Sequence, residues 1–358
     1  METKRILVDL FLLKNRFVGL GEFCAQLGSG LAKKAADLKQ KHDVELYFLV
    51  EKKFKGCFGY DVNYIVMPHN LLPLMFLYPK RFDLFHETRQ TCNFSVNADH
   101  TLLTVHDINF KYEKKGRKLE RYSNKLRRIL NKCDYVNFIT EFVKRDTESA
   151  FEVMAQKKVI YNGATDLTSG VPEKNPFYGR GIPEKDFLLH ISGLNPKKNI
   201  RLLIEMMKHL ADEKIVIAGN WKSAYGDSNK ELIKKLNLKN VYCLENVTEE
   251  QKAWLYGNCK AFFFPSLCEG FGLPPVEAMY FGKPVFLSTL TSLPEVGGEN
   301  AFYFKELIPE KMAETVSSSL KSIQPDLPEK LRKNALKFSW ENCVENYINY
   351  YLEILNLK

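Results

Sequence analysis

Short apolar runs, each long enough for one buried strand, recur along the whole chain and most constrain its fold. Several lack the alternation of apolar and polar residues that a half-solvated strand shows, so they are typical of strands covered on both faces of a parallel sheet. Helix-like stretches such as 199–212 and 227–237 lie between them. Alternating strands and helices predict an α/β fold. The predicted strands are 5–13, 44–50, 101–107, 134–140, 186–192, 213–219, 240–245, 261–266 and 283–288.

The length of 358 residues is enough for two domains of ordinary size. Residues 161–186 are rich in Gly, Pro and polar residues and show no periodicity, so we interpret them as an interdomain linker. The chain ends in an aromatic-rich helical stretch. We therefore expect a first domain over 1–165, a second over 166–340 and a C-terminal helix over 341–358.

Composition excludes several protein classes. Hydrophobic residues make up 45% and charged residues 27%, as in ordinary globular proteins. No apolar run reaches about 18 residues and no signal peptide is evident, which predicts a cytoplasmic protein. None of the 8 cysteines forms a CxxC pair, so neither a zinc site nor a thiol–disulfide motif is expected. The net charge of +9 favours an anionic partner such as a nucleotide, a phospholipid head group or a nucleic acid.

Positive charge is concentrated between Lys111 and Lys132, where there are ten Lys or Arg residues and only two acidic residues, Glu113 and Glu120. Aromatic and aliphatic residues are interleaved with them, so the segment can form a basic amphipathic helix. Two interpretations stay open. The helix can present a solvated charged face, or it can bind an anionic membrane surface.

The stretch "PSLCEGFGLPPVEAM", residues 265–279, combines two acids, two glycines and two adjacent prolines. A proline suits the first turn of a helix and Gly282 suits its C-terminal end, so 267–273 should be a loop between a strand's carboxyl end and a helix. In open α/β sheets, ligands bind at that place.

The chemistry of this loop favours a sugar nucleotide. Gly270 and Gly272 leave backbone N–H groups open to a phosphate at a helix N-terminus. The Glu277 carboxylate can accept hydrogen bonds from the two vicinal hydroxyls of a ribose, and Glu269 can meet a second ring. The alternative is a glycine-rich turn with two exposed acids.

These residues carry a resemblance to a known family. "EGFGLPPVE" is similar to the Glu-x7-Glu motif of the retaining glycosyltransferases with the GT-B fold, often called family 4. Further resemblances lie at 159–166, 191–207, 261–304 and 338–351, and weaker ones in "FVGLGEF" (17–23) and "TVHDINF" (104–110). The resemblance implies two Rossmann-like domains facing each other across a cleft, with the C-terminal helix crossing back to the N-terminal domain. The first domain would bind the acceptor and the second the nucleotide sugar.

The resemblance also implies roles in the second domain. Glu277 would bind the donor ribose, and Glu269 would hold the donor sugar. Backbone amides of the following residues would hold the sugar and its phosphates: Gly270, Phe271, Gly272 and Leu273. Lys198 matches a lysine that contacts the diphosphate, with Lys197 equally plausible beside it. The family often has an arginine at 197, and some members have one where this chain has Gly193.

In the first domain, Gly19 and Gly21 follow the first strand, where the family's glycine loop approaches the diphosphate or the acceptor. Cys24 stands where a dinucleotide fingerprint needs glycine, which disfavours nicotinamide. His106 matches a histidine that faces the donor sugar, and Asp107 completes that pair. The catalytic set implied by the resemblance is thus His106, Glu269 and Lys198.

Three other positions are weaker candidates. His86, in "DLFHE", ends another strand. Thr140 and Glu141 stand where many relatives have Ser-Glu.

The chain has no Asp-x-Asp, so a metal-bridged diphosphate site is not expected, and no metal or other cofactor is predicted. Lysine and helix amides would neutralise the diphosphate. We also find no convincing carboxylate nucleophile for a double displacement. The family mechanism is same-face attack, with the leaving phosphate assisting deprotonation of the acceptor.

The function predicted from the resemblance is transfer of a hexose, with mannose as the first choice, from a GDP- or UDP-sugar to a lipid-linked, lipopolysaccharide or polysaccharide acceptor. The enzyme would be cytoplasmic, on the inner face of a membrane, and would bind no nucleic acid. The alternatives are an epimerase or hydrolase of sugar nucleotides on the same scaffold, and a non-catalytic basic binding protein.

Overall fold

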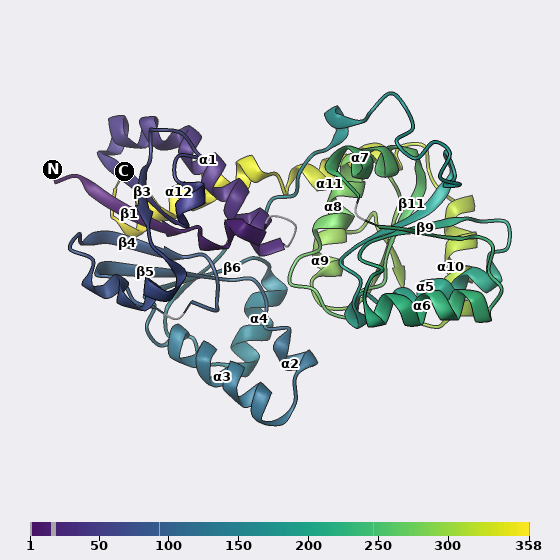
Figure 1. The fold of residues 1–358 in the computed structure, drawn as a ribbon, viewed down its shortest axis with the longest axis horizontal. Helices are drawn as coiled ribbons and strands as arrows, with labels where there is room; N and C mark the ends of the chain where they lie inside the picture. Colours follow the sequence, from purple (N-terminus) through teal and green to yellow (C-terminus); the bar gives the residue numbers. More distant parts are fainter. Residues whose placement is uncertain (1, 16–18, 93, 246, 358) are drawn as a thin grey trace. The chain divides into compact units, whose positions relative to one another are not determined.

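The computed structural model describes residues 2–15, 19–92, 94–245 and 247–357. The chain divides into two compact units. Unit 1 contains Met1–Gly163 together with Trp340–Lys358, and unit 2 contains Ala164–Ser339. Figure 1 shows the two units and the elements within each of them.

Among the described residues, unit 1 builds one sheet of seven parallel strands in the order β3-β2-β1-β4-β5-β6-β7. The strands are β1 Lys4–Asp9, β2 Val44–Val50, β3 Asn63–Val66, β4 Phe82–Glu87, β5 Ala98–Val105, β6 Tyr135–Phe138 and β7 Gln156–Val159. The short 3-10 helices are η1 Phe11–Asn15, η2 Lys52–Phe54 and η3 His69–Leu77. The α-helices are α1 Gly19–His42, α2 Phe110–Glu113, α3 Gly116–Leu130, α4 Glu141–Ala150 and α12 Trp340–Ile354.

The first strand is shorter than the predicted run 5–13. It ends at Asp9, whose Oδ1 accepts the backbone N–H of Phe11 at 2.9 Å. That turn starts η1, so the apolar residues Phe11 and Leu13 are buried from a 3-10 helix and not from a strand. A side chain that hydrogen-bonds the backbone two residues ahead offers the chain an alternative to the sheet ladder.

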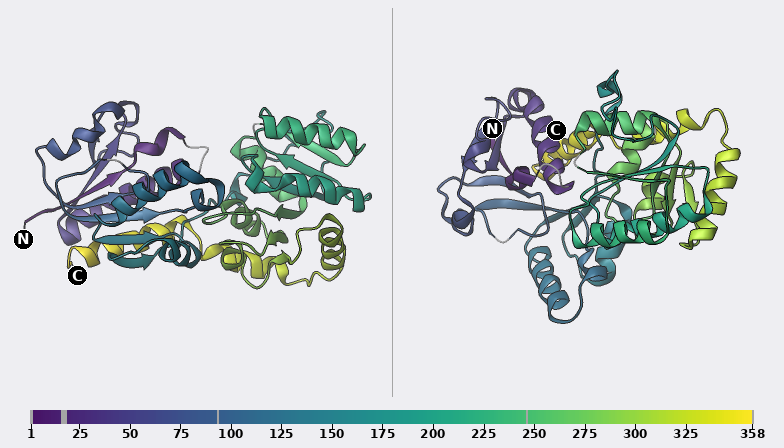
Figure 2. Two further views of the ribbon diagram at one scale, coloured as in Figure 1. Left: turned by 90° about the horizontal axis from the view of Figure 1, so that it is seen from below. Right: turned by 45° about the vertical axis from the view of Figure 1, so that its right-hand side comes forward.

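The C-terminal helix α12 is part of unit 1, where it packs beside α1 on one face of the sheet (Figure 1, Figure 2). Buried hydroxyls join it to the strands. Tyr351 and Thr104 hydrogen-bond the two ring nitrogens of His86 at 2.6 and 2.8 Å. The Tyr347 hydroxyl lies 3.0 Å from that of Thr104 and accepts from Asn137 Nδ2 at 2.7 Å.

Unit 2 forms a sheet of six parallel strands within the described residues, in the order β10-β9-β8-β11-β12-β13. The strands are β8 Phe187–Ile191, β9 Ile215–Ala218, β10 Val241–Leu244, β11 Cys259–Phe264, β12 Val285–Ser288 and β13 Phe302–Phe304. The 3-10 helices are η4 Thr168–Gly170, η5 Pro196–Lys198 and η6 Met207–His209. The α-helices are α5 Ile200–Met206, α6 Ala224–Lys235, α7 Glu249–Asn258, α8 Leu273–Tyr280, α9 Leu293–Gly297, α10 Pro309–Lys321 and α11 Leu327–Leu336.

The two sheets confirm the α/β fold with two Rossmann-like domains. In unit 2 the chain runs outward from β8 through β9 to β10 and then returns to pair β11 with the other side of β8. Ligands bind outside the carboxyl ends of the strands where the order reverses in this way. The carboxyl ends of β8 and β11 are therefore the place to look for a site.

The segment interpreted as a linker is folded. Ala164 and Ser339 form a β-bridge, and from Ala164 onward the chain belongs to unit 2. Within this segment Phe177 is 1% exposed and packs on Trp254, with ring centroids 5.5 Å apart.

The basic segment forms two helices, α2 and α3, where a single one was expected (Figure 1). Lys115 is extended at φ −135°, and Gly116 has a φ of +54°, a left-handed conformation that favours glycine. The break therefore falls before Gly116. Leu126 and Leu130 of α3 are buried while its basic residues are mostly exposed, so α3 is amphipathic as predicted.

Candidate active site

The main candidate site lies at the point in unit 2 where the strand order reverses. β8 is followed by η5, which ends at Lys198, and β11 is followed by the loop that carries Glu269 and leads into α8. Because β8 and β11 are hydrogen-bonded neighbours, both connections leave the sheet at the same edge. The topology thus brings together two segments about 70 residues apart in the sequence.

Lys198 and Glu269 form an ion pair there, with Nζ 2.5 Å from Oε1. Their side chains are only 14% and 12% exposed. The ammonium also lies 4.8 Å from the centroid of the Phe264 ring, a cation–π contact. The Ser266 hydroxyl lies 2.5 Å from the same Glu269 oxygen. The sequence placed both charged residues at one site but did not predict that they pair.

Lys197 contributes through its backbone. Its carbonyl accepts the Leu267 N–H at 2.7 Å and lies 3.0 Å from the Ser266 hydroxyl. These bonds tie the connection after β8 to the loop after β11. Of the two lysines that the sequence left equally plausible, Lys198 is the one whose ammonium meets Glu269.

The loop before α8 has the predicted form. Gly272 has a φ of +114° and caps α8, Leu273 begins the helix, and prolines occupy its first turn. Gly270 and Phe271 are buried, and the Phe271 ring packs edge-on against Phe338. At the other end, Gly282 adopts a φ of +67° and donates its N–H to Met279. The expected helix ends are confirmed.

Two residues that sequence reasoning missed hold this loop from the next strand connection. Thr291 Oγ1 accepts the Glu269 N–H at 3.0 Å. The Ser292 hydroxyl lies 2.8 Å from the Phe271 carbonyl and 3.1 Å from that of Glu269. Both follow β12, so the rule that strand ends line the site would have found them.

Glu277 lies one turn into α8 and is 7% exposed, while Glu269 is 9% exposed. The alternative of two exposed acids is therefore wrong. Glu277 Oε1 lies 3.2 Å from Lys252 Nζ, and Oε2 accepts the Tyr256 hydroxyl at 2.8 Å. Both partners come from α7 and were not identified from the sequence.

His106 follows β5 in unit 1 and is 6% exposed. Its Nε2 lies 2.8 Å from the Thr88 carbonyl oxygen, and its ring packs edge-on against Phe23. Burial lowers the pKa of His106 to about 4, although the hydrogen bond to Thr88 opposes the shift. The imidazole is thus neutral near pH 7. Its neighbour Asp107 accepts the Asn109 N–H at 3.0 Å.

The other candidates of unit 1 lie within helices or in the hydrogen-bond network that holds them. Gly19 and Gly21 lie in the first turn of α1, where a loop was expected, and the neighbouring Phe17 and Val18 of the quoted motif lie outside the described residues. His86 belongs to the network that holds α12, and burial lowers its pKa to about 3. Thr140 caps α4, accepting the Val143 N–H at 3.1 Å. Glu141 is the first residue of that helix.

The predicted residues therefore form two groups. Unit 2 brings together Lys198, Glu269 and the loop 270–273, with Glu277 one turn further along α8. His106, Gly19 and Gly21 belong to unit 1. Among the described residues, no group of three or more His, Cys, Asp or Glu side chains is placed to hold a metal ion. No helix in the described ranges is long and apolar enough to cross a membrane.

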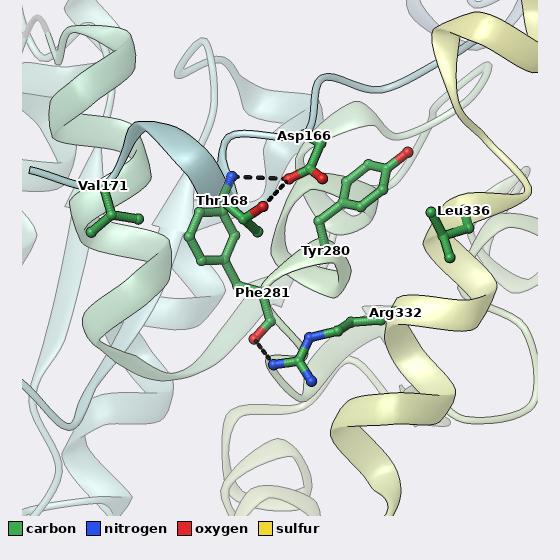
Figure 3. Close-up of a pocket in the computed structure, with 7 residues that line it drawn as sticks. All are labelled: Asp166, Thr168, Val171, Tyr280, Phe281, Arg332 and Leu336. Carbon is green, nitrogen blue, oxygen red and sulfur yellow. Dashed lines mark hydrogen bonds between the residues drawn. The ribbon is translucent and has the colours of Figure 1, made fainter.

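A pocket of about 430 Å³ lies elsewhere in unit 2 (Figure 3). Tyr280 and Phe281 at the C-terminal end of α8 line it, whereas the candidate site lies at the N-terminal end. Arg332 donates to the Phe281 carbonyl at 3.4 Å, and Asp166 accepts from Thr168. The predicted site residues do not line this pocket.

Comparison with known proteins shows which sequences and folds this chain resembles. Residues 175–338 match the family model described as glycosyl transferases group 1. The O-antigen chain mannosyltransferase B of Escherichia coli is 28% identical over 275 residues, which cover 71% of this chain and 70% of that protein.

Two solved structures share the fold over almost the whole chain. Sucrose-phosphate synthase from Thermosynechococcus elongatus superposes with a TM-score of 0.76 at 17% identity, covering 99% of both chains. The HepE protein of Anabaena, in complex with UDP and glucose, does so with a TM-score of 0.71 at 15% identity, covering 98% of this chain and 99% of that one. The sequence matches identify the chain as a glycosyltransferase. The structural matches show that its fold is GT-B.

Proposed function

We propose that this glycosyltransferase transfers mannose, with retention, from a nucleotide-sugar donor to a saccharide or lipid-linked acceptor of the lipopolysaccharide or polysaccharide type. The family resemblance of the Glu-x7-Glu block and the similarity to an O-antigen mannosyltransferase support the sugar and the acceptor class. The complex of HepE with UDP and glucose supports a nucleotide-sugar donor. GDP-mannose is the donor we would test first.

The observation that carries the proposal is the buried Lys198–Glu269 pair at the strand reversal. An ammonium that is largely removed from water interacts strongly with a diphosphate, and the leaving diphosphate gains charge as the glycosidic bond breaks. In our proposal the diphosphate replaces Glu269 as the partner of Lys198. Glu269 then accepts hydrogen bonds from hydroxyls of the donor sugar.

The backbone around Gly270, Phe271, Gly272 and Leu273 completes the donor site in this proposal. Amides at the N-terminus of α8 face the phosphates, because the N–H groups of a helix's first turn and the helix dipole favour an anion there. Glu277 accepts the ribose hydroxyls. No metal is invoked, since Lys198 and these amides supply the positive charge.

In unit 1 we assign to His106 a hydrogen bond with the donor sugar. Its neutral imidazole offers one donor and one acceptor near pH 7, and Nε2 is already held by Thr88. The Nδ1 atom is then the one left for a hydroxyl. We assign to Gly19 and Gly21, which begin α1, the role that the family resemblance implies, namely close approach to the diphosphate or the acceptor.

The test is transfer from radiolabelled GDP-mannose and UDP-glucose to a mannose-terminated lipid-linked oligosaccharide, with product stereochemistry read by NMR. Donor consumption without acceptor would indicate the alternative, a hydrolase or an epimerase. Glu277→Gln and Lys198→Gln should each abolish most transfer while the far-UV circular dichroism stays unchanged. Normal transfer by both variants would contradict the site.

A second part of the proposal is that α3 holds the enzyme on the cytoplasmic face of a membrane. Its exposed basic residues and the half-exposed Tyr122 fit an anionic interface, where each Lys or Arg near the surface contributes about 1 kcal/mol. Lys111 is already engaged, since its ammonium lies 2.9 Å from Asp146. The binding surface is therefore α3 and not α2.

Vesicle sedimentation tests this part. We would neutralise the basic face of α3 by changing Arg117, Lys118, Arg121, Arg127 and Arg128 to Gln. Binding to vesicles with phosphatidylglycerol should fall, while a control with Lys230, Lys234 and Lys235 of α6 changed to Gln should bind as the wild type. Equal binding by both would disprove the membrane role.

A further inference from the structure

We propose that Lys252 and Tyr256 are positioning residues that fix the Glu277 carboxylate for a ribose, so that the enzyme prefers ribonucleotides to 2′-deoxyribonucleotides. The inference rests on the proposed function, because Glu277 is taken as the ribose acceptor. It adds two residues that the Glu-x7-Glu motif does not contain.

The two residues come from one face of one helix. Lys252 and Tyr256 are four residues apart in α7 and therefore lie one turn above each other. The start of α7 is fixed by a capping box in which Thr248 and Gln251 each bond the other's backbone. Lys252 is the next residue after this box. The Tyr256 ring is held by Phe262 and Phe281, with centroid distances of 5.6 and 5.7 Å.

The two oxygens of the Glu277 carboxylate contact different partners. Lys252 Nζ lies 3.2 Å from Oε1, and the Tyr256 hydroxyl donates to Oε2 at 2.8 Å. An ionised carboxylate has about four acceptor positions, two on each oxygen. One position on each oxygen is thus taken, and one on each is left. Two vicinal hydroxyls are the ligand that needs two such positions.

Burial makes this arrangement stiff. The Tyr256 side chain is fully buried, and the Lys252 and Glu277 side chains are 17% and 9% exposed. Burial alone would lower the pKa of Lys252, but the charges of Glu277 and Glu249 outweigh it and raise the pKa above its ordinary value. Burial and the charge of Glu277 raise the pKa of Tyr256 well above its ordinary value. Both groups therefore remain proton donors to Glu277 near pH 7.

Lys252 is also held from the solvent side. Its Nζ lies 3.3 Å from Glu249 Oε1, on the same helix. The ammonium is thus fixed between two carboxylates and cannot swing away from Glu277 without losing the second contact. A carboxylate held by both neighbours keeps one orientation, so its remaining acceptor positions stay fixed.

The experiment measures dissociation constants by calorimetry for GDP and 2′-deoxy-GDP, and for UDP and 2′-deoxy-UDP. A hydrogen bond to a charged group is worth about tenfold or more in affinity, so the wild type should bind the deoxy form about tenfold more weakly. In Tyr256→Phe and Lys252→Met, the ratio of the dissociation constant of the deoxy form to that of the ribo form should fall toward 1. Lys252→Arg should restore most of it. Transfer assays should show a raised KM with kcat little changed.

The controls are Lys260→Gln, which removes a matched ion pair with Glu213 at the other edge of the sheet, and Tyr303→Phe, which removes a hydroxyl bonded to Gly298. Both should keep the wild-type ratio. Tyr256→Phe preserves the ring contacts, so it should fold, as a melting curve will verify.

The inference is overturned if the Tyr256 and Lys252 variants fold and prefer ribonucleotides as strongly as the wild type does, while Glu277→Gln loses that preference. A wild type that binds nucleotides without preferring ribose would remove the role of Glu277 and this inference with it. Absence of any nucleotide binding would instead contradict the proposed function itself.

Discussion

Tyr347→Phe should weaken the attachment of the C-terminal helix to unit 1 without disturbing unit 2. The substitution removes only a hydroxyl, because the ring keeps its packing against Phe23 and His86. That hydroxyl is fully buried and joins α12 to β5 and β6. The change therefore isolates the polar network from the apolar contacts.

The expected loss of unfolding free energy follows from the buried polar group that Tyr347→Phe leaves unpaired. Asn137 Nδ2 loses its acceptor, and Asn137 Oδ1 already has no hydrogen-bond partner among the described residues. Leaving one buried donor unsatisfied costs about 1–3 kcal/mol, whereas Thr104 keeps its contact with His86. We expect unit 1 to lose about 2 kcal/mol of unfolding free energy. Replacing Asn137 by Leu in the same chain should recover part of this loss, since both partners are then apolar.

Hydrogen-exchange mass spectrometry is the suitable assay, because a two-domain chain need not unfold in one step. Peptides from α12 and β6 should lose protection in Tyr347→Phe, while peptides from β8 and β11 serve as the internal reference. Unchanged protection of α12 would show that the network does not stabilise the helix. If the double variant Tyr347→Phe with Asn137→Leu loses as much stability as the two single variants together, the argument about the unpaired Asn137 donor is refuted.

Three further outcomes are expected. Lys198→Gln should lower kcat/KM about 100-fold in the transfer assay, and Lys197→Gln much less; equal losses would contradict the ion-pair assignment. Gly272→Ala should cost about 1–3 kcal/mol in thermal unfolding, because its φ is +114° and a Cβ would lie 2.9 Å from Leu293, whereas Gly257→Ala in α7 should cost nothing. Burial and the neighbouring Asp9 raise the pKa of Glu87 to about 8, so native unit 1 keeps a proton that the unfolded chain has released. Its stability should therefore fall as the pH rises from about 4.5, the ordinary pKa of a glutamate, to about 8, and Glu87→Gln should remove that slope.

The strands and the donor loop could be read from the sequence because their signals are local. Uninterrupted apolar runs marked the central strands, and Gly272, the two prolines and Gly282 marked the ends of α8. β3, β7 and β13 were not predicted, since edge strands of three or four residues carry too little apolar pattern. The end of β1 was misjudged because Asp9 turns the chain by one side-chain hydrogen bond.

The pairing within the site could not be read from local signals. Nothing in the sequence near Lys252 indicates Glu277, because the contact depends on how α7 and α8 pack beside β11. The same holds for Lys198 and Glu269, which meet only because β8 and β11 are neighbours. Residue types and positions were therefore predictable, whereas their partners required the tertiary fold.

The β-bridge between Ala164 and Ser339 has a practical consequence. Because the Ala164 N–H also donates to Phe338 at 2.8 Å, unit 2 is one continuous segment whose two ends are hydrogen-bonded together. In the sequence, unit 2 is thus a single insertion between the two parts of unit 1. Exchange of the whole stretch for the equivalent part of another transferase would leave every strand of the host sheet intact. If unit 2 binds the donor and unit 1 the acceptor, as the family resemblance implies, donor choice and acceptor choice would be recombined at two adjacent splice points.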